Sequence, residues 1–286
     1  MRYQLPALIL FGIGPLGTAY ADLVGLGVVG IFHLTVIIVF GIVMILLRRG
    51  DELKKALKYK PIWISSLIYT FSSALGLVVM VVVPLPTFAM FIQLTAFTGL
   101  ILAPLWGVYP NKFDWLALPV ALIGGILVVN GSLSSVSVIG WILMTVYIFA
   151  AAVSIHYFAG VASKEEISAP AAVWSISLVG APLVLFQPSL LHADPLALLA
   201  IAGTGLAYAL GNLLLFISIR TSPAHRFMLL TGVAALTTTV LSVLLLNDPW
   251  SLLVVLGGAV VFLAIIILFF AEKRSEKEKQ ETTEPV

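Results

Sequence analysis

The sequence predicts an all-α integral membrane protein, with ten transmembrane helices arranged as two inverted five-helix repeats and both termini in the cytoplasm. Three observations support this fold class. The 286 residues are 61% hydrophobic and only 10% charged, with a mean hydropathy of +1.14, whereas a soluble domain is about half apolar and one quarter charged. Apolar stretches of about 20 residues, the length that spans a bilayer core, recur along the whole chain. The cations gather in a few short segments between these stretches.

Turn-forming or charged residues separate the ten apolar stretches. The glycine-rich ADLVGLGVVG divides the first two, and RRGDELKKALKYK (48–60) divides the second from the third. Pro84 and Pro86 separate spans three and four, because proline interrupts a helix. The expected spans are 4–21, 25–47, 61–82, 86–108, 114–131, 136–157, 168–187, 196–217, 224–246 and 250–271.

The later boundaries are polar turns. YPNKFD (109–114) follows span four, and GSLSSVS (131–137) separates the two halves. QPSLLHADP (187–195) carries two prolines, and NDP (247–249) forms a tight turn before the last span. The first apolar stretch lacks a following cleavage site, so we expect it to remain as a helix rather than act as a signal peptide.

The distribution of cations sets the expected orientation. With the N-terminus inside, every Lys and Arg falls on the cytoplasmic side, while the predicted outer loops carry only Asp22, Asp194 and Asp248. This is the positive-inside bias of membrane proteins. The cations of RRGDELKKALKYK therefore indicate orientation, with lipid-headgroup contact secondary, rather than a nucleic-acid surface, because apolar spans flank them. The tail 272–286 is expected to be a disordered cytoplasmic segment.

Two blocks of the sequence are similar to each other. In each, a proline precedes a methionine by four or five residues, an aspartate comes shortly before a tryptophan, and a glycine pair ends the block. Five spans per half is an odd number, so the halves must have opposite orientations. This predicts inverted repeats over 1–131 and 132–271, an arrangement typical of transporters with a substrate site between the halves. The matching pairs are Pro86–Met90 and Pro223–Met228, Asp114–Trp115 and Asp248–Trp250, and Gly124–Gly125 and Gly257–Gly258.

Several features of the chain together resemble a known family. These are ten spans in two halves, inside termini, short turns after spans four and nine, and the segment GLAYALGN (205–212) followed by LSVLLLNDPW. The resemblance is to the EamA-type family of the drug/metabolite transporter superfamily. The Ala-Tyr-Ala-x-x-Asn arrangement from Ala207 to Asn212 is most similar to bacterial amino-acid exporters. Two features depart from the family. The turns YPNKFD and NDPW lack its frequent glutamate, and QLTAFTG and LTGVAALTTT lack its frequent proline. These departures concern the substrate subgroup more than the fold.

The predicted spans carry almost no charge in their interiors. No Asp, Glu, Lys or Arg lies centrally in any of them, although such residues usually mark function within a membrane. A strongly anionic substrate and proton coupling through a buried carboxylate are therefore not expected. His33 is the only central titratable candidate, and His156 lies near the inner end of span six. Each is either a hydrogen-bonded packing residue or a proton carrier.

Uncharged polar and aromatic residues form stripes on several spans. Such stripes must face the bundle or a wet cavity, because lipid offers no hydrogen-bond partners. Tyr208 and Asn212 share one face of span eight, and the matching stretch of the family lines its cavity. The alternative role is interhelical hydrogen bonding, worth on average under about 1 kcal/mol each. The residues expected to contact substrate are Tyr208, Asn212, Gln93, Tyr69, Ser73, Phe149, Tyr147, Trp141, His33 and Thr231.

The sequence offers no set of residues that an intramembrane enzyme would need. It contains no cysteine, no H-E-x-x-H or G-x-S-x-G motif, no glycine-rich phosphate loop and no histidine cluster. We therefore expect no catalytic residues, no metal site and no cofactor.

The function expected from these features is secondary transport by alternating access in the cytoplasmic membrane of a prokaryote. The cargo would be a small neutral or zwitterionic metabolite, such as an amino acid or a drug-like compound, and spans three, four, six, eight and nine would line its path. Alternatives are a flippase for a lipid or lipid-linked headgroup, an uptake carrier for a small organic cation, or a channel. Expected partners are the substrate and membrane lipids but no nucleic acid. A coupling proton and the oligomeric state stay open.

Overall fold

A computed structural model describes residues 3–21, 25–83, 88, 91–128, 136–162, 167–220, 222–246 and 251–283. Within these ranges every regular element is a helix and no strand occurs, which confirms the all-α prediction for them. The helices of the first predicted half are α1 (Gln4–Ala21), α2 (Leu26–Leu46), α3 (Gly50–Lys58), α4 (Lys60–Val82), α6 (Leu94–Leu102), the 3-10 helix η1 (Ala103–Trp106) and α7 (Lys112–Val128).

The second predicted half also consists of helices, and two of its expected spans are interrupted. Span seven is divided into α9 and the 3-10 helix η2, and span nine into α11 and α12. The helices are α8 (Val138–Ala162), α9 (Ala169–Ile176), η2 (Ala181–Phe186), η3 (Pro188–His192), α10 (Pro195–Ile219), α11 (Ala224–Leu229), α12 (Thr231–Leu246) and α13 (Leu252–Thr283).

Seven helical segments of the described chain are long and apolar enough to cross a membrane, judged by length and composition. Many large side chains on them face outward; Leu46, Val138 and Leu252 are 76%, 75% and 73% exposed. A multi-pass membrane protein accounts for both findings. Two further apolar helices, Gln4–Ile13 and Leu94–Trp106, are shorter. The seven are Leu26–Leu46, Lys60–Val79, Val138–Val161, Ala169–Phe186, Pro195–Ile219, Ala224–Leu241 and Leu252–Phe270.

The cationic segment between α2 and α4 forms a short helix, α3, that the sequence analysis did not foresee. Its acidic residues lie in the first turn and its basic residues in the last, which suits the helix dipole. Leu53 and Ala56 are buried, and α3 packs against α9. The segment is therefore part of the packed surface of the bundle.

The C-terminal helix α13 continues well beyond the last predicted span. The tail is predicted to be disordered from residue 272 onward, whereas residues 272–283 are helical in the structure. The segment AEKRSEKEKQE consists mostly of strong helix formers, with opposite charges four residues apart at Arg274–Glu278 and Lys277–Glu281. Because it extends a helix that already exists, it needs no new helix nucleus.

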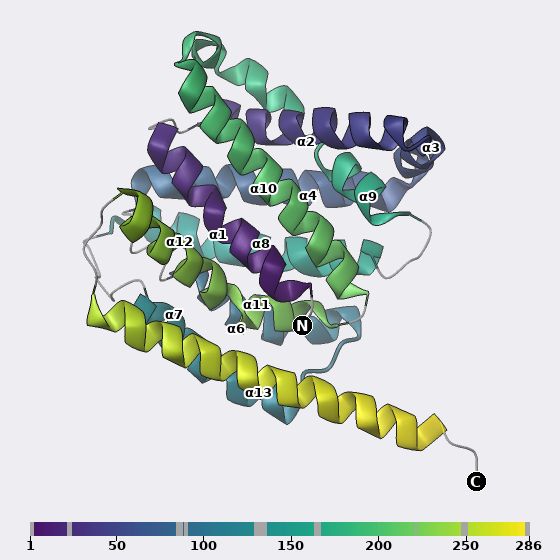
Figure 1. The fold of residues 1–286 in the computed structure, drawn as a ribbon, viewed down its shortest axis with the longest axis vertical. Coiled ribbons are helices and arrows are strands. Elements are labelled where there is room, and N and C mark those ends of the chain that lie inside the picture. The colour runs from purple at the N-terminus through teal and green to yellow at the C-terminus, as the bar shows by residue number, and fades with distance from the viewer. Residues whose placement is uncertain are drawn as a thin grey trace.

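The main helix contacts join the two predicted halves to each other. α1 packs against α10 and α12, and α8 packs against α4 and α6. α2 packs on η2, and α7 packs along α13, visible at the lower edge of Figure 1. The core therefore lies between 1–131 and 132–271 rather than inside either half.

Glycines allow the closest of these contacts. A Cβ atom on Gly257 of α13 would lie 2.5 Å from the Val128 nitrogen and 2.8 Å from the Gly124 oxygen of α7. A Cβ atom on Gly30 of α2 would collide with the backbone of Val184 in η2. Without side chains at these positions the helices approach to backbone contact, a common way to pack helices in membranes.

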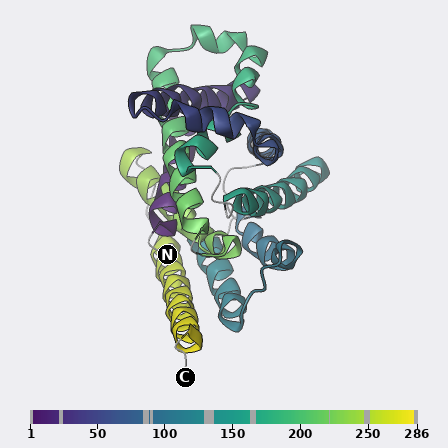
Figure 2. The same cartoon turned by 90° about the vertical axis from the view of Figure 1, so that its right-hand side faces the viewer.

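The helix ends that carry most cations lie on one side of the bundle, which we call the cationic face. The N-terminal end of α1, the helix α3 and the C-terminal end of α13 point toward the right in Figure 1, whereas α12 ends and α13 begins on the left. Figure 2 looks onto the cationic face and shows both chain termini there. Arg48 and Arg49 directly precede α3, Lys54, Lys55 and Lys58 lie in it, Lys112 begins α7, Arg220 follows α10, and Lys273 lies in the C-terminal part of α13.

Replacing Gly257 with alanine tests the contact between α7 and α13. Gly257→Ala should lower stability, because overpacking costs about 1–3 kcal/mol and outweighs the gain in helix propensity of about 1 kcal/mol. Thermal unfolding in detergent, followed by tryptophan fluorescence, measures the change. The matched control is Gly203→Ala in α10, where a Cβ atom meets nothing within 4 Å and stability should hold or rise. Equal midpoints for the two variants would contradict the predicted role of the contact.

Candidate functional site

A cavity of about 340 Å³ lies between α1, α2, α4, α8, α10 and α12, with residues of both predicted halves in its wall. This volume is at the lower end of the range for small-molecule sites, about 300–1,000 Å³. Eight of the ten residues expected to contact substrate line it: His33, Tyr69, Ser73, Gln93, Tyr147, Tyr208, Asn212 and Thr231.

A hydrogen bond between Asn212 of α10 and Tyr69 of α4 joins the two halves at the cavity wall. Asn212 Nδ2 donates to Tyr69 Oη at 2.7 Å and to the Tyr208 carbonyl oxygen at 2.9 Å. These bonds use both N–H groups of the amide. Tyr69, Tyr208 and Asn212, which come from two helices distant in sequence, therefore form one connected polar group.

A second contact between the halves occurs where two helices are interrupted. Gln93 lies in a turn just before α6, and Leu230 separates α11 from α12. Thr231 Oγ1, at the start of α12, is 3.1 Å from Gln93 Oε1 and 2.9 Å from the Met228 carbonyl oxygen. A hydroxyl has a single hydrogen, so it donates to one of these oxygens at a time. The bond to Gln93 can therefore be exchanged without leaving the hydroxyl unpaired.

Several phenylalanines that the sequence analysis missed complete the wall. Phe11 and Phe32 flank the Tyr208 ring at centroid distances of 5.4 and 6.0 Å. Phe88 lies 5.3 Å from the Tyr147 ring. The chain has 16 phenylalanines, mostly on apolar helices, and no sequence pattern separates those that face a cavity from those that face lipid.

Phe149 and Trp141, the other two expected site residues, do not line this cavity. Phe149 is 51% exposed and Trp141 is 39% exposed on the outer side of α8. Tyr147 lines the cavity, and a residue two positions later on a helix lies about 200° further around the axis. The Trp141 ring instead packs edge-on against Phe91, with centroids 4.7 Å apart.

His33 is held in the wall by a glycine behind it. Its ring meets Tyr69 edge-on, with centroids 5.7 Å apart. The imidazole also fills the space beside Gly180, because a Cβ atom on Gly180 would collide with the ring. Gly180 itself is not a lining residue.

The cavity wall offers hydrogen bonds and aromatic faces but no formal charge. No Asp, Glu, Lys or Arg is among its described lining residues. Across the described part of the chain, no three His, Cys, Asp or Glu residues are grouped to hold a metal ion. The chemistry available at the site is the binding of amide, hydroxyl, carboxylate or ring groups.

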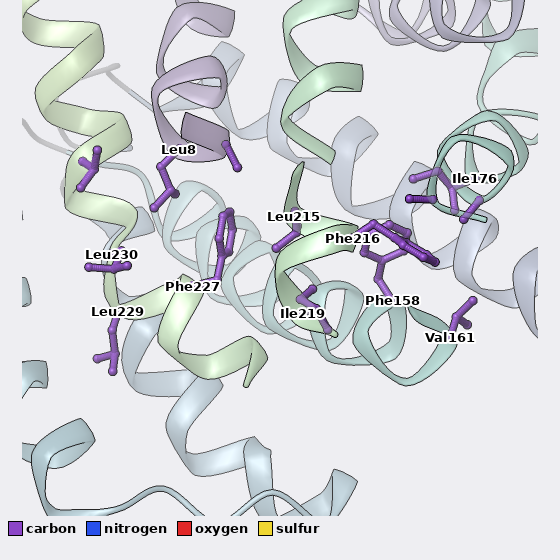
Figure 3. Close-up of a cluster of buried hydrophobic side chains, with 14 of the residues drawn as sticks. Leu8, Phe158, Val161, Ile176, Leu215, Phe216, Ile219, Phe227, Leu229 and Leu230 are labelled. Atoms are coloured by element: carbon purple, nitrogen blue, oxygen red, sulfur yellow. The ribbon is translucent and has the colours of Figure 1, made fainter. Parts of the chain in front are cut away.

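A packed hydrophobic cluster lies between the cavity and the helix ends at the cationic face. Phe158 and Phe216, in the last two turns of α8 and α10, meet edge-on with centroids 5.1 Å apart. Leu8, Leu215 and Phe227 belong to the same cluster and also line the cavity, so they form its floor. Figure 3 shows these side chains on α1, α8, α10 and α11, with Phe158 and Phe216 close together on the right and Leu215, Phe227 and Leu8 further to the left.

Removing the Tyr69 hydroxyl while keeping its ring tests the bond between the halves. Tyr69→Phe should lower stability by about 0.5–1.5 kcal/mol, because Asn212 Nδ2 loses a buried partner. Thermal unfolding in detergent measures the change. Tyr109→Phe is the matched control, since Tyr109 is 79% exposed and should be neutral. If the two variants unfold alike, the bond contributes nothing to stability.

No protein-family model matches this chain, and no curated protein matches it. Among solved structures, 28 chains match. One of them, described only as "Crystal structure of protein", has a TM-score of 0.77 and 14% sequence identity over 96% of this chain and 98% of its own length. The chain therefore shares its fold with a solved structure over nearly its whole length.

Proposed function

We propose that this chain is a carrier of the cytoplasmic membrane that moves a small neutral or zwitterionic metabolite by alternating access, like the drug/metabolite transporters that its sequence resembles. The observation that carries the proposal is a cavity walled by helices of both halves, with no Asp, Glu, Lys or Arg among its described lining residues and with packed hydrophobic side chains between it and the cationic face. Carriers built from inverted repeats bind their substrate in this position, between the halves. The cationic face would lie in the cytoplasm.

The helix packing supports ten spans in two inverted halves. If the spans of the halves correspond in order, α8 is the counterpart of α1, α10 of α4, and α11 with α12 of α6. The packing of α1 on α10 and α12 then has its counterpart in that of α8 on α4 and α6. The pairs α2 with η2 and α7 with α13 join corresponding spans directly. A two-fold axis in the membrane plane would produce this reciprocity.

Two residue contacts support the same axis. Gly124 and Gly257, which correspond in the sequence repeat, approach each other between α7 and α13. Gln93 and Thr231 each lie three residues after the methionine of their block, and they are in contact at 3.1 Å. Residues near a two-fold axis contact their own counterparts. Both helices are interrupted at this point, as are the substrate-binding helices of many carriers.

The cavity wall favours a molecule with polar groups at one end and an apolar or aromatic body. Two pairs of side chains in the wall are hydrogen-bonded in the present arrangement, Asn212 with Tyr69 and Thr231 with Gln93. Each pair can exchange its bond for bonds to a substrate. The rings around Tyr208 provide apolar contact and can face an ammonium group. A substrate with a net negative charge finds no Lys or Arg among the described lining residues, so its loss of hydration would go uncompensated.

A small organic cation is the second candidate cargo. The observation that favours it is the group of rings formed by Phe11, Phe32 and Tyr208, because such faces attract ammonium groups. Competition between amines and amino acids in one counterflow assay separates the two candidates.

Single cysteines test the proposed topology, because the chain has none of its own. Gly50→Cys and Thr282→Cys should react with a membrane-impermeant thiol reagent only from the cytoplasmic side, and His192→Cys only from the outside. Labelling of intact cells and inverted vesicles measures this. Reaction of Gly50→Cys and Thr282→Cys on opposite sides would rule out ten spans with both termini inside.

Counterflow in proteoliposomes with a panel of amino acids and amines tests transport. Tyr147→Ala and Asn212→Ala should lower the saturable flux about tenfold or more, as expected when a contact worth about 1.4 kcal/mol is lost. Phe149→Ala is the matched control, because Phe149 lies on the same helix as Tyr147 but is 51% exposed and outside the cavity. No saturable flux with any compound, or equal losses in Tyr147→Ala and Phe149→Ala, would contradict the proposal.

A further inference from the structure

A buried ion pair joins the two halves at the cationic face, between Asp114 in the first turn of α7 and Arg226 of α11. Arg226 Nε donates to Asp114 Oδ1 at 2.8 Å, and the two side chains are 10% and 1% exposed. His225 Nε2 lies 3.2 Å from Asp114 Oδ2, although it is not aligned for a hydrogen bond. The sequence predicts Arg226 only as one of the cytoplasmic cations, and no sequence pattern predicts this pair.

Asp114 is held in position by the cap of its own helix. Asn111 Oδ1 accepts hydrogen bonds from the backbone N–H groups of Phe113 and Asp114, at 2.8 and 3.1 Å. Asp114 Oδ2 in turn accepts one from the Asn111 N–H at 2.9 Å. This reciprocal capping box fixes the carboxylate. One carboxylate oxygen therefore belongs to the cap, and the other is directed at the opposite half.

The ion pair is mechanically connected to the floor of the cavity. Arg226 directly precedes Phe227, which lines the cavity, and Met228 fills the space beside Gly99 of α6. The short helix α11 contacts α6, α7 and α8. α11 therefore cannot move away from the first half without separating Arg226 from Asp114 and opening the floor.

Two buried polar atoms in and just before α11 have no hydrogen-bond partner among the described residues. They are His225 Nδ1 and Ser222 Oγ. Buried atoms of this kind cost free energy that water would relieve. The ion pair itself has lost its hydration, and either charge left alone in the dry interior would be strongly unfavourable. Water that enters at this face would hydrate the ion pair and these two atoms, which lowers the free-energy cost of separating the charges.

We propose that Asp114 and Arg226, with His225 beside them, form the latch that holds the cavity closed toward the cationic face. The ion pair separates and becomes hydrated each time the cavity opens on that side. This inference rests on the proposed alternating access and adds the residues that control its cytoplasmic opening.

Thiol labelling tests the latch without requiring transport. Ser154→Cys places a single thiol in the cavity wall, and an impermeant reagent is applied to the cytoplasmic side of inverted vesicles. Adding Asp114→Asn, which keeps the shape of the side chain, should raise the labelling rate about tenfold or more, and Arg226→Gln should do the same. Asp51→Asn is the matched control. It removes the exposed ion pair with Lys54 on the same side and should leave the rate unchanged.

Two outcomes of the labelling experiment would overturn the latch. One is an unchanged rate in Asp114→Asn and Arg226→Gln that fold as monodisperse proteins. The other is an equal rise in Asp51→Asn, which would reflect general loosening of this face.

A disulfide test keeps both latch charges and so avoids variants that fail to fold. A Cβ atom on Gly99 lies 3.5 Å from Met228 Cβ, within the range of about 3.5–4.5 Å found in disulfides. In Gly99→Cys with Met228→Cys, oxidation should stop counterflow, and reduction should restore it. Flux is the readout, so no additional cavity thiol has to be labelled. Full flux in the oxidised protein, with the crosslink verified by mass, would overturn the latch. Absence of flux in the parent chain would count against the proposed function alone, because thiol labelling still reports on the latch.

Discussion

Lipid tails neither donate nor accept hydrogen bonds, and this constraint determines where the polar side chains of the bundle lie. Ser66 Oγ of α4 donates to the Ile176 carbonyl oxygen at 2.7 Å, and Thr238 Oγ1 of α12 donates to the Gly12 carbonyl oxygen at 2.7 Å. The indole N–H of Trp174 donates to a backbone carbonyl of α2 at 3.1 Å. Each of these bonds crosses from one predicted half to the other, so satisfying the polar groups also joins the halves.

Two sets of polar groups differ from these fixed bridges. At the cavity, the Asn212 amide donates one N–H to the Tyr208 carbonyl oxygen and the other to the Tyr69 hydroxyl, a side-chain partner that a substrate can replace. At the cationic face, the charges of Asp114 and Arg226 are dry but lie close to the end of the bundle. The proposed carrier uses both sets: bonds that a substrate can replace in the middle, and a pair that water can separate at one end.

Local rules explain what the sequence could predict. Bilayer length and hydropathy predicted spans 4–21 and 25–47, and the structure has α1 at Gln4–Ala21 and α2 at Leu26–Leu46. The rotation of a helix is not local, because Tyr147 and Phe149 are equivalent as sequence and only the packing of α8 decides which ring meets the cavity. Pairing across 112 residues, as between Asp114 and Arg226, likewise depends on how the halves come together.

Gly180 leaves a recess for the His33 ring, so a substitution at position 180 can change the selectivity of such a cavity during evolution. Any larger residue at position 180 would push the imidazole forward and reshape the chamber from behind, with every wall residue unchanged. In the proposed carrier, cargo preference is thus open to change through a position outside the cavity wall. Two relatives with identical linings can differ in what they admit if they differ at this one hidden site.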